Sequence, residues 1–506
     1  MDITVKRSGI ACCEKVFEQS VSLEEAAEAV VPDTQPDAEY ILCADGEALI
    51  RSKDVLDGRV NVSAQVEAVV LYAPEGGDGV CSLDVAVPVT VELEAPDVTP
   101  DSLATASITV TGIEARLLNP RKVIVRCMVS VELQCWNRGE LRISSGLEGE
   151  DAGKVETLTE SCTMSPVVCV REKTFVVSDE YQLQPGLLPI GTVLGGTVEI
   201  RQGGVRSVGS RLLFSGAVRL DVLYLSAGGS ELCSAQFESE YSQMLDADTE
   251  LACPDCCVYS VLTAKYIEPV TLAGGEKGIS AEYHIVSQCV CSDSVRAQCL
   301  TDCYSNSAAL ELGYERVDGV CVQRRANIRA AAHEQLPASP QPVSICRTSG
   351  CLGIPECADG MLRCAVTVTV LYTASDGKVY SAKRRLTCEA PSELGADEYA
   401  AGVGAACAEC TAVITQGGFD LRAVVDFELL SAKRLEFMQL ESVTDTEAEE
   451  NESRPSVTVI RAAQGDTLWS LGKKYHSTPA LITSLNGLEE GDALAGRVLL
   501  IPYAGK

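Results

Sequence analysis

The sequence predicts a mainly β protein, with three tandem antiparallel β sandwich- or barrel-like domains followed by a small C-terminal β-α-α-β module. Three observations lead to this prediction. The triplet Val-Leu-Tyr occurs at residues 70–72, 222–224 and 370–372, so that successive tyrosines lie 152 and 148 residues apart. Apolar and polar residues alternate before each triplet, and a glycine-containing turn follows it. A spacing of this length is too long for a solenoid and indicates tandem domains.

Each triplet closes a run in which every second residue is apolar. In the first copy these positions are Val60, Val62, Ala64, Val66, Ala68, Val70 and Tyr72. A strict period of two over this length predicts a strand with one buried and one solvated face. Gly76-Gly77, Gly228-Gly229 and Asp376-Gly377 then supply turns, and the alternating run after each turn predicts a hairpin.

A later alternating strand recurs in each copy, at residues 123–131, 279–285 and 421–427. These landmarks assign residues 1–150 to an N-terminal segment with the first repeat, 151–310 to the second repeat and 311–440 to the third. The run Ser-Leu-Glu-Glu-Ala-Ala-Glu-Ala at residues 22–29 predicts a short helix ahead of the first repeat. The acidic residues 441–455 predict a solvated linker to the C-terminal module, residues 456–506.

The composition narrows the class of protein. The 506 residues include 41 Lys and Arg against 72 Asp and Glu, a net charge of −31, while 46% of the residues are hydrophobic. The chain therefore has enough apolar side chains for folded cores, but its charge disfavours nucleic acid and anionic membrane surfaces. No window reaches the ~18 apolar residues of a membrane-spanning helix. Because the N-terminus lacks the apolar core of an export signal, the 24 cysteines are interpreted as reduced thiols in the cytoplasm.

Residues 456–506 contain four acidic and five basic side chains, so that a nearly neutral module follows a strongly acidic body. Strands are expected at residues 457–460 and 498–502. Between them, Asp466 is expected to cap a first helix. Thr478-Pro479 is a start signal for a second helix, which ends at Asn486-Gly487. The expected order is therefore β-α-α-β.

This module resembles the LysM domain. The match rests on Gly465-Asp466-Thr467-Leu468-Trp469 before the first helix, Asn486-Gly487 after the second, and Leu500-Ile501-Pro502 in the last strand. The resemblance implies binding of N-acetylglucosamine-containing glycans in a groove. The implied site residues are Gly465, Asp466, Thr467 and Leu468 in one turn and Asn486, Gly487 and Leu488 in the facing loop. Trp469 is interpreted as part of the core of the module.

The order of the domains resembles that of clostridial spore-coat morphogenesis proteins, in which tandem SPOCS (spore-coat-associated) domains precede one LysM domain. The residues that support this match are Val31-Pro32-Asp33, Pro36-Asp37, Ile41-Leu42 and the Val-Leu-Tyr strand ends. The resemblance implies a cytoplasmic protein of the mother cell that is recruited to the forespore surface. It also implies that the LysM domain contacts the coat basement-layer ATPase, the stage IV spore morphogenetic protein.

No arrangement typical of catalysis is apparent, and no cofactor is expected. The three histidines, His284, His333 and His476, lie far apart in the sequence and without a metal-ligand spacing. His284 is expected on the polar face of a strand and His333 in a loop. Two Cys-x-x-Cys pairs, Cys253/Cys256 and Cys407/Cys410, could together supply the four ligands of a zinc ion. They are interpreted instead as small residues at the start of a strand, with a Cys–His hydrolase and a wall hydrolase as further, less favoured alternatives.

The leading hypothesis is therefore a non-enzymatic scaffold of spore-coat assembly. Its acidic repeats would bind other coat proteins or associate with one another, and its LysM module would dock on the coat ATPase. The alternative is a protein of the spore cortex or cell wall that binds peptidoglycan.

Overall fold

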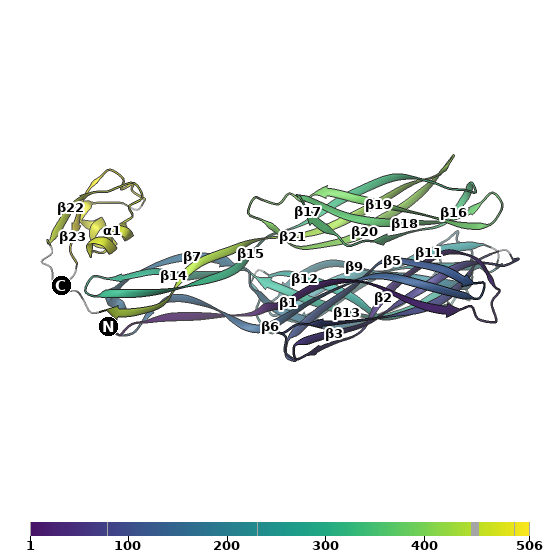
Figure 1. Ribbon diagram of the computed structural model, residues 1–506, viewed down its shortest axis with the longest axis horizontal. Helices are drawn as coiled ribbons and strands as arrows, with labels where there is room; N and C mark the ends of the chain where they lie inside the picture. The colour runs from purple at the N-terminus through teal and green to yellow at the C-terminus, as the bar shows by residue number, and fades with distance from the viewer. Residues whose placement is uncertain are drawn as a thin grey trace.

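The computed structural model describes residues 2–77, 79–229, 231–252, 254–446, 455–489 and 491–504. The mainly β fold is confirmed: three β sandwiches precede a small C-terminal module with two helices (Figure 1). In each sandwich, one sheet is a hairpin-linked meander. The other sheet has the last long strand of the repeat at its centre.

The first sandwich pairs the sheet β2-β3-β4 with the sheet β1-β6-β5. Its strands are β1 (Thr4–Val30), β2 (Ala38–Leu56), β3 (Arg59–Pro74), β4 (Cys81–Glu94), β5 (Leu103–Asn119) and β6 (Lys122–Glu148). The predicted apolar face of β3 is buried between the two sheets. Tyr72 closes this face with no exposed surface, and its hydroxyl donates to Oε1 of Gln35 at 2.8 Å.

The helix predicted for residues 22–29 is wrong, because these residues form the end of β1. β1 pairs with β6 from Thr4 opposite Glu148 to Val30 opposite Lys122. Its inward positions, including Leu23, pack against the sandwich core, while Glu24 is exposed. Pairing with β6 and burial of one face override the helix propensity of the Ala- and Glu-rich sequence.

The second sandwich pairs the sheet β9-β10-β11 with the sheet β8-β13-β12, and β7 with β14 forms a separate two-stranded ribbon. The elements are the 3₁₀ helix η1 (Ala152–Lys154) and the strands β7 (Val155–Met164), β8 (Val167–Tyr181), β9 (Ile190–Val208), β10 (Arg211–Ser226), β11 (Leu232–Asp246), β12 (Pro254–Thr271), β13 (Lys277–Asp293) and β14 (Val295–Ser305).

The third sandwich pairs β18, flanked by β16, β17 and β19, with the sheet β15-β21-β20. Its strands are β15 (Ala309–Pro337), β16 (Pro342–Leu352), β17 (Glu356–Ala358), β18 (Met361–Ala374), β19 (Val379–Pro391), β20 (Tyr399–Thr415) and β21 (Gly418–Thr446). The first six residues of the predicted linker 441–455 thus belong to β21. Residues 447–454 of that linker lie outside the described residues.

The three predicted hairpins are confirmed by the strand register. Tyr72 pairs with Cys81, Leu225 with Leu232, and Thr373 with Val379 across the glycine-containing turns. The leucine of each Val-Leu-Tyr triplet points away from the core that buries the tyrosine. Leu71, Leu223 and Leu371 are each only 2% exposed, because they meet in one apolar cluster between the three sandwiches. The repeated triplet therefore builds both the core of each sandwich and the contact between sandwiches.

A buried ion cluster also joins the three sandwiches. The Arg347 side chain on β16 is 8% exposed and lies 3.1 Å from Asp45 of the first sandwich and 3.4 Å from Asp221 of the second. It also donates to Oγ1 of Thr197 at 3.1 Å. Arg347 lines a cavity of about 470 Å³ to which all three sandwiches contribute. Burial alone would lower the pKa of this guanidinium, but the two carboxylates hold it above its usual value.

At the other end, three two-stranded ribbons extend from the sandwiches and pack together (Figure 1). We call these ribbons the stalk: residues 4–13 with 138–148, β7 with β14, and residues 309–322 with 432–446. Their apolar side chains form two small cores, one of which contains Ile3, Val155, Leu300, Cys303, Leu440 and Val443. Gln439, with no exposed surface, ties two ribbons together by accepting from the Ser144 amide at 2.9 Å.

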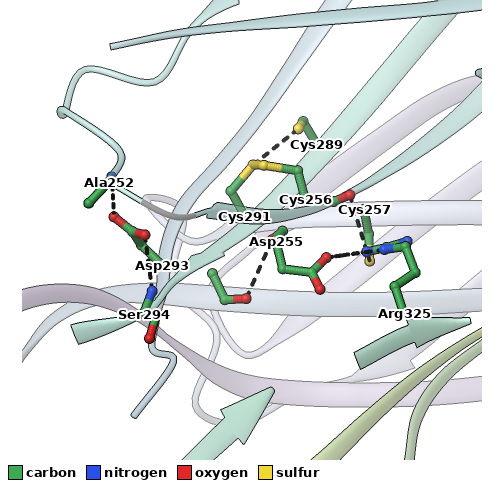
Figure 2. Close-up of a disulfide and its surroundings, with 10 residues drawn as sticks. Ala252, Asp255, Cys256, Cys257, Cys289, Cys291, Asp293, Ser294 and Arg325 are labelled. Atoms are coloured by element: carbon green, nitrogen blue, oxygen red, sulfur yellow. Dashed lines mark hydrogen bonds and ion pairs between the residues drawn. A yellow bond between two sulfur atoms is a disulfide. The ribbon is translucent and has the colours of Figure 1, made fainter. Parts of the chain in front are cut away.

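The interpretation of all cysteines as reduced is wrong at one position, because Cys256 on β12 and Cys291 on β13 form a disulfide (Figure 2). The two residues are direct partners in the antiparallel register, so their side chains lie on the same face of the sheet. The spacing 256–291 in the sequence did not reveal this pairing, since it depends on the register of a hairpin.

Candidate binding site

The C-terminal module has the predicted order β-α-α-β. Its elements are β22 (Val457–Arg461), α1 (Leu468–Tyr475), α2 (Pro479–Asn486) and β23 (Val498–Pro502). The two strands are antiparallel partners, with Val459 opposite Leu500. The core of the module consists of Ala462, Leu471, Ile482, Leu488, Leu494, Leu499 and Ile501.

The first predicted site segment, residues 465–468, is a turn that its own side chains stabilise. Asp466 accepts from the Ala463 amide at 2.7 Å, and therefore closes the turn instead of capping α1 as predicted. The cap is Thr467, which accepts from the Ser470 amide at 3.0 Å while the Ser470 hydroxyl accepts from the Thr467 amide at 2.9 Å. This reciprocal pair is a capping box. Gly465 is exposed with a φ of 94°, and Leu468 packs against the module core.

The second predicted segment, residues 486–488, is equally well bonded. The Asn486 side-chain amide donates to the Leu500 carbonyl at 2.7 Å, and its Oδ1 accepts from the Leu500 amide at 2.8 Å. Asn486 therefore joins α2 to β23. Gly487 ends α2 in the left-handed region with a φ of 57°, and Leu488 is buried in the module core.

Both segments contribute to one core through Leu468 and Leu488, but their polar side chains bond within the module. Asp466, Thr467 and Asn486 each hold a backbone partner. The exposed parts of the predicted site are Gly465, Thr467 and Gly487. A glycan in this groove would therefore meet mainly backbone groups, and substitution of Asp466 or Asn486 would disturb the fold of the module as well as any ligand contact.

Trp469 does not belong to the core of the module, so its predicted core role is wrong. Its indole Nε1 donates to Oδ2 of Asp302, on the stalk strand β14, at 2.9 Å. The Tyr304 ring packs edge-on against Trp469 at 4.8 Å, and the Tyr304 hydroxyl donates to the Ser477 carbonyl at 2.8 Å. Lys473 adds an ion pair to Asp302 at 2.6 Å. The module is thus docked on the stalk through α1.

Gly472 allows this docking. A Cβ atom at position 472 would lie 2.4 Å from the Tyr304 hydroxyl, too close for any side chain. Sequence reasoning missed Asp302 and Tyr304 because nothing in the local sequence of β14 links them to a module more than 160 residues away. The exposed acid Asp302 sits at a register irregularity of β14, which turns it out of the β7 pairing.

The face of the module opposite its helices is apolar and open. Val457, Val459, Val498 and Leu500 on the outer face of β22 and β23 are 44%, 62%, 59% and 39% exposed. Leu481 and Leu485, one turn apart on α2, are 44% and 46% exposed. We call these six residues the apolar surface. Exposed apolar clusters of this kind are typical of protein-contact sites.

The residues considered for catalysis or zinc binding lie apart. His284 bonds to Glu282 at 2.7 Å, His476 ends α1, and His333 lies within β15 opposite Arg422, not in a loop as predicted. Cys407 and Cys410 lie on β20, where Arg201 of the second sandwich donates to the Cys407 carbonyl at 3.0 Å. Cys256 instead pairs with Cys291, so the described residues of the two Cys-x-x-Cys pairs do not meet; Cys253 lies outside the described residues.

Comparison with known proteins gives two matches to family models. Residues 37–118 match the SPOCS domain of SipL, and residues 460–502 match the LysM domain. The first match covers β2 to β5 of the first sandwich, and the second covers most of the C-terminal module. No curated protein and no solved structure matches the chain. Among the described residues, no helix has the length and apolar character needed to cross a bilayer. The chain therefore combines a SipL-type SPOCS domain with a C-terminal LysM domain, the organisation of a sporulation protein with a peptidoglycan-binding type of module.

Proposed function

We propose that this chain is a non-enzymatic adaptor of spore-coat assembly, whose LysM module docks on the coat basement-layer ATPase at the forespore surface in the mother cell. The observation that supports a protein partner is the apolar surface of the module. Its six side chains are between 39% and 62% exposed, whereas the polar side chains of the groove bond within the module. An apolar surface gains most from contact with another protein, because both surfaces lose water.

The acidic sandwiches would then serve as the body of the adaptor and contact other coat proteins. The stalk places the module at the end of the molecule, beyond the ends of the sandwiches (Figure 1). This position leaves the apolar surface accessible while the sandwiches are engaged elsewhere. Two engaged ends on one chain raise the effective concentration of each partner for the other.

The test is binding of the purified full chain to the purified ATPase. Val459→Asp places a charge at the centre of the apolar surface and should weaken binding at least tenfold. The matched control is Val413→Asp on β20 of the third sandwich, where the valine is 64% exposed against 62% for Val459. Equal binding by the wild-type chain and Val459→Asp, with both folded, would contradict the proposal.

The second candidate function is peptidoglycan binding, which the LysM match and the exposed Gly465 and Gly487 favour. Co-sedimentation of the full chain with purified cell wall or spore cortex tests it. Retention that soluble N-acetylglucosamine oligomers abolish, and that Val459→Asp leaves unchanged, would favour the glycan function over docking on the ATPase. Wall-substrate zymography would reveal any hydrolase activity, which we do not expect.

A further inference from the structure

Three cysteines of the second sandwich lie together at one end of the sheet β8-β13-β12. The sulfur atoms of Cys256, Cys289 and Cys291 lie within 4.8 Å of one another. Cys256 and Cys291 form the disulfide, and the Cys289 sulfur lies 3.5 Å from that of Cys291 (Figure 2). Cys289 and Cys291 have no exposed surface, and Cys256 is half-buried at the start of β12.

The strand register explains why these sulfurs converge. Cys256 is the direct partner of Cys291, and Cys289 lies two residues away on the same face of β13. Cys169 on β8 is the direct partner of Cys291 on the other side, so one row across three strands contains three cysteines. This face of the sheet therefore has a fourth thiol next to the group of three.

The grouping differs from the arrangement of other buried cysteines in the chain. In the third sandwich, Cys364 and Cys388 are also direct partners in neighbouring strands and almost fully buried, yet they form a pair without a third sulfur. In the first sandwich, Cys135 on β6 faces Ala104 and Phe17. Packing of the repeat does not require three cysteines at one place, which makes a chemical role the better explanation in the second sandwich.

We propose that Cys256, Cys289 and Cys291, once their disulfide is reduced, form a binding site for one thiophilic divalent cation, with Zn²⁺ as the physiological class. Three or four sulfur ligands are the donor set that zinc prefers in structural sites. A dithiol reductant supplies two electrons and two protons to the disulfide and becomes a disulfide itself. The cation then replaces the protons of the three thiols, which pass to solvent.

The site has two exclusive states, because a sulfur in the Cys256–Cys291 bond cannot also act as a thiolate ligand. In the absence of a cation, burial raises the pKa of the Cys289 thiol to about 12, which keeps this group neutral in the core. A bound cation supplies the positive charge that stabilises the thiolates instead. Half-buried Cys256, at the first turn of chain before β12, gives the route of entry from the end of the strand.

The test uses the full chain, reduced with a phosphine under argon, and Cd²⁺ as a spectroscopic probe in the presence of a competing chelator. We expect one Cd²⁺ per chain, with an ultraviolet charge-transfer band from thiolate to cadmium. Cys289→Ser should weaken retention at least tenfold, while Cys364→Ser, which changes the two-cysteine pair of the third sandwich, should leave it unchanged. The oxidised chain should bind at least tenfold more weakly than the reduced chain.

Retention of Cd²⁺ by Cys289→Ser at the wild-type level would overturn the proposal, as would equal binding by oxidised and reduced protein. If Cys289→Ser does not fold, Cys256→Ser at the half-buried position provides the same test. Zinc content of the reduced protein, before and after the chelator, is the independent readout. None of these measurements involves the ATPase or peptidoglycan, so their outcome is separate from that of the proposed function.

Discussion

Replacement of Arg347 by methionine tests whether one buried cation holds the three sandwiches together. Its guanidinium lies 3.1 Å from Asp45 and 3.4 Å from Asp221, and the side chain is 8% exposed. At an effective dielectric constant of about 20, each contact contributes about 5 kcal/mol of Coulomb attraction. The energy needed to remove the three charged groups from water offsets most of this gain.

The cost of the substitution is therefore set by the carboxylates that stay behind. Arg347→Met leaves Asp45 and Asp221 without their shared cation, at side-chain exposures of 22% and 17%. Removal of one partner from a buried ion cluster lowers the free energy of unfolding by about 3–5 kcal/mol. The triple variant Arg347→Met, Asp45→Asn, Asp221→Asn removes all three charges and should recover most of this loss, because no buried charge is left unpaired.

Urea unfolding followed by circular dichroism provides the measurement. The control is Arg316→Met on the stalk, where Arg316 pairs with Glu436 at 2.7 Å but is 57% exposed, so its loss should cost less than about 1 kcal/mol. A single variant Arg347→Met within about 1 kcal/mol of wild type would refute the reasoning. A triple variant as unstable as the single one would also refute it, since that result would assign the loss to packing and not to charge.

Three further predictions concern separate contacts. Leu223→Ala at the meeting point of the sandwiches should lower the free energy of unfolding by about 2–5 kcal/mol in the same urea assay; a loss no larger than that of Leu118→Ala, where the leucine is 51% exposed, would contradict the buried contact. Asp302→Ala removes the acceptor of the Trp469 indole and should release the LysM module, shifting its tryptophan fluorescence to longer wavelength; unchanged emission would show that the ring contact alone holds it. Burial raises the pKa of Glu47 although Lys265 opposes this, so the native state binds this proton more tightly than the unfolded chain. The resulting contribution to stability is complete below the usual glutamate pKa of about 4.3 and is lost as the pH rises through the native pKa, so Glu47→Gln should make the unfolding free energy less dependent on pH above that value; an unchanged pH profile would contradict the assignment.

Most of the strands could be predicted from the sequence, because a strand buried on one face leaves its period of two in the chain. The faces ending at Tyr72, Tyr224 and Tyr372 are examples, and the turns after them require glycine or aspartate for local reasons. The LysM helices could be predicted for the same reason, since Thr478 and Pro479 mark a helix start within the local sequence. Local rules suffice where the structure itself is local.

The errors fall where a distant partner decides. Residues 22–29 have helical composition but pair with β6, about a hundred residues later in the chain. Trp469 is apolar enough for a core, yet its hydrogen-bond partner is Asp302 on the stalk. A signal did exist for the contact between sandwiches: each triplet has a leucine at the position that alternation assigns to solvent. An identical apolar residue on the wet face of three strands indicates a buried surface.

The positions next to these leucines show what three fused copies allow that three identical chains would not. The residue that pairs with the shared leucine on the neighbouring strand is Cys43 in the first sandwich, Gly195 in the second and Arg347 in the third. In a symmetric trimer of one repeat, three arginines would converge where these residues lie, and their repulsion would oppose assembly. The tandem chain places a single arginine there and provides two acids for it. A Cβ atom at position 195 would lie 2.9 Å from the Val69 side chain, so the glycine in turn allows the close approach of the first two sandwiches. Sequence divergence between the copies thus supports the same near-symmetric packing that the repeated leucines establish.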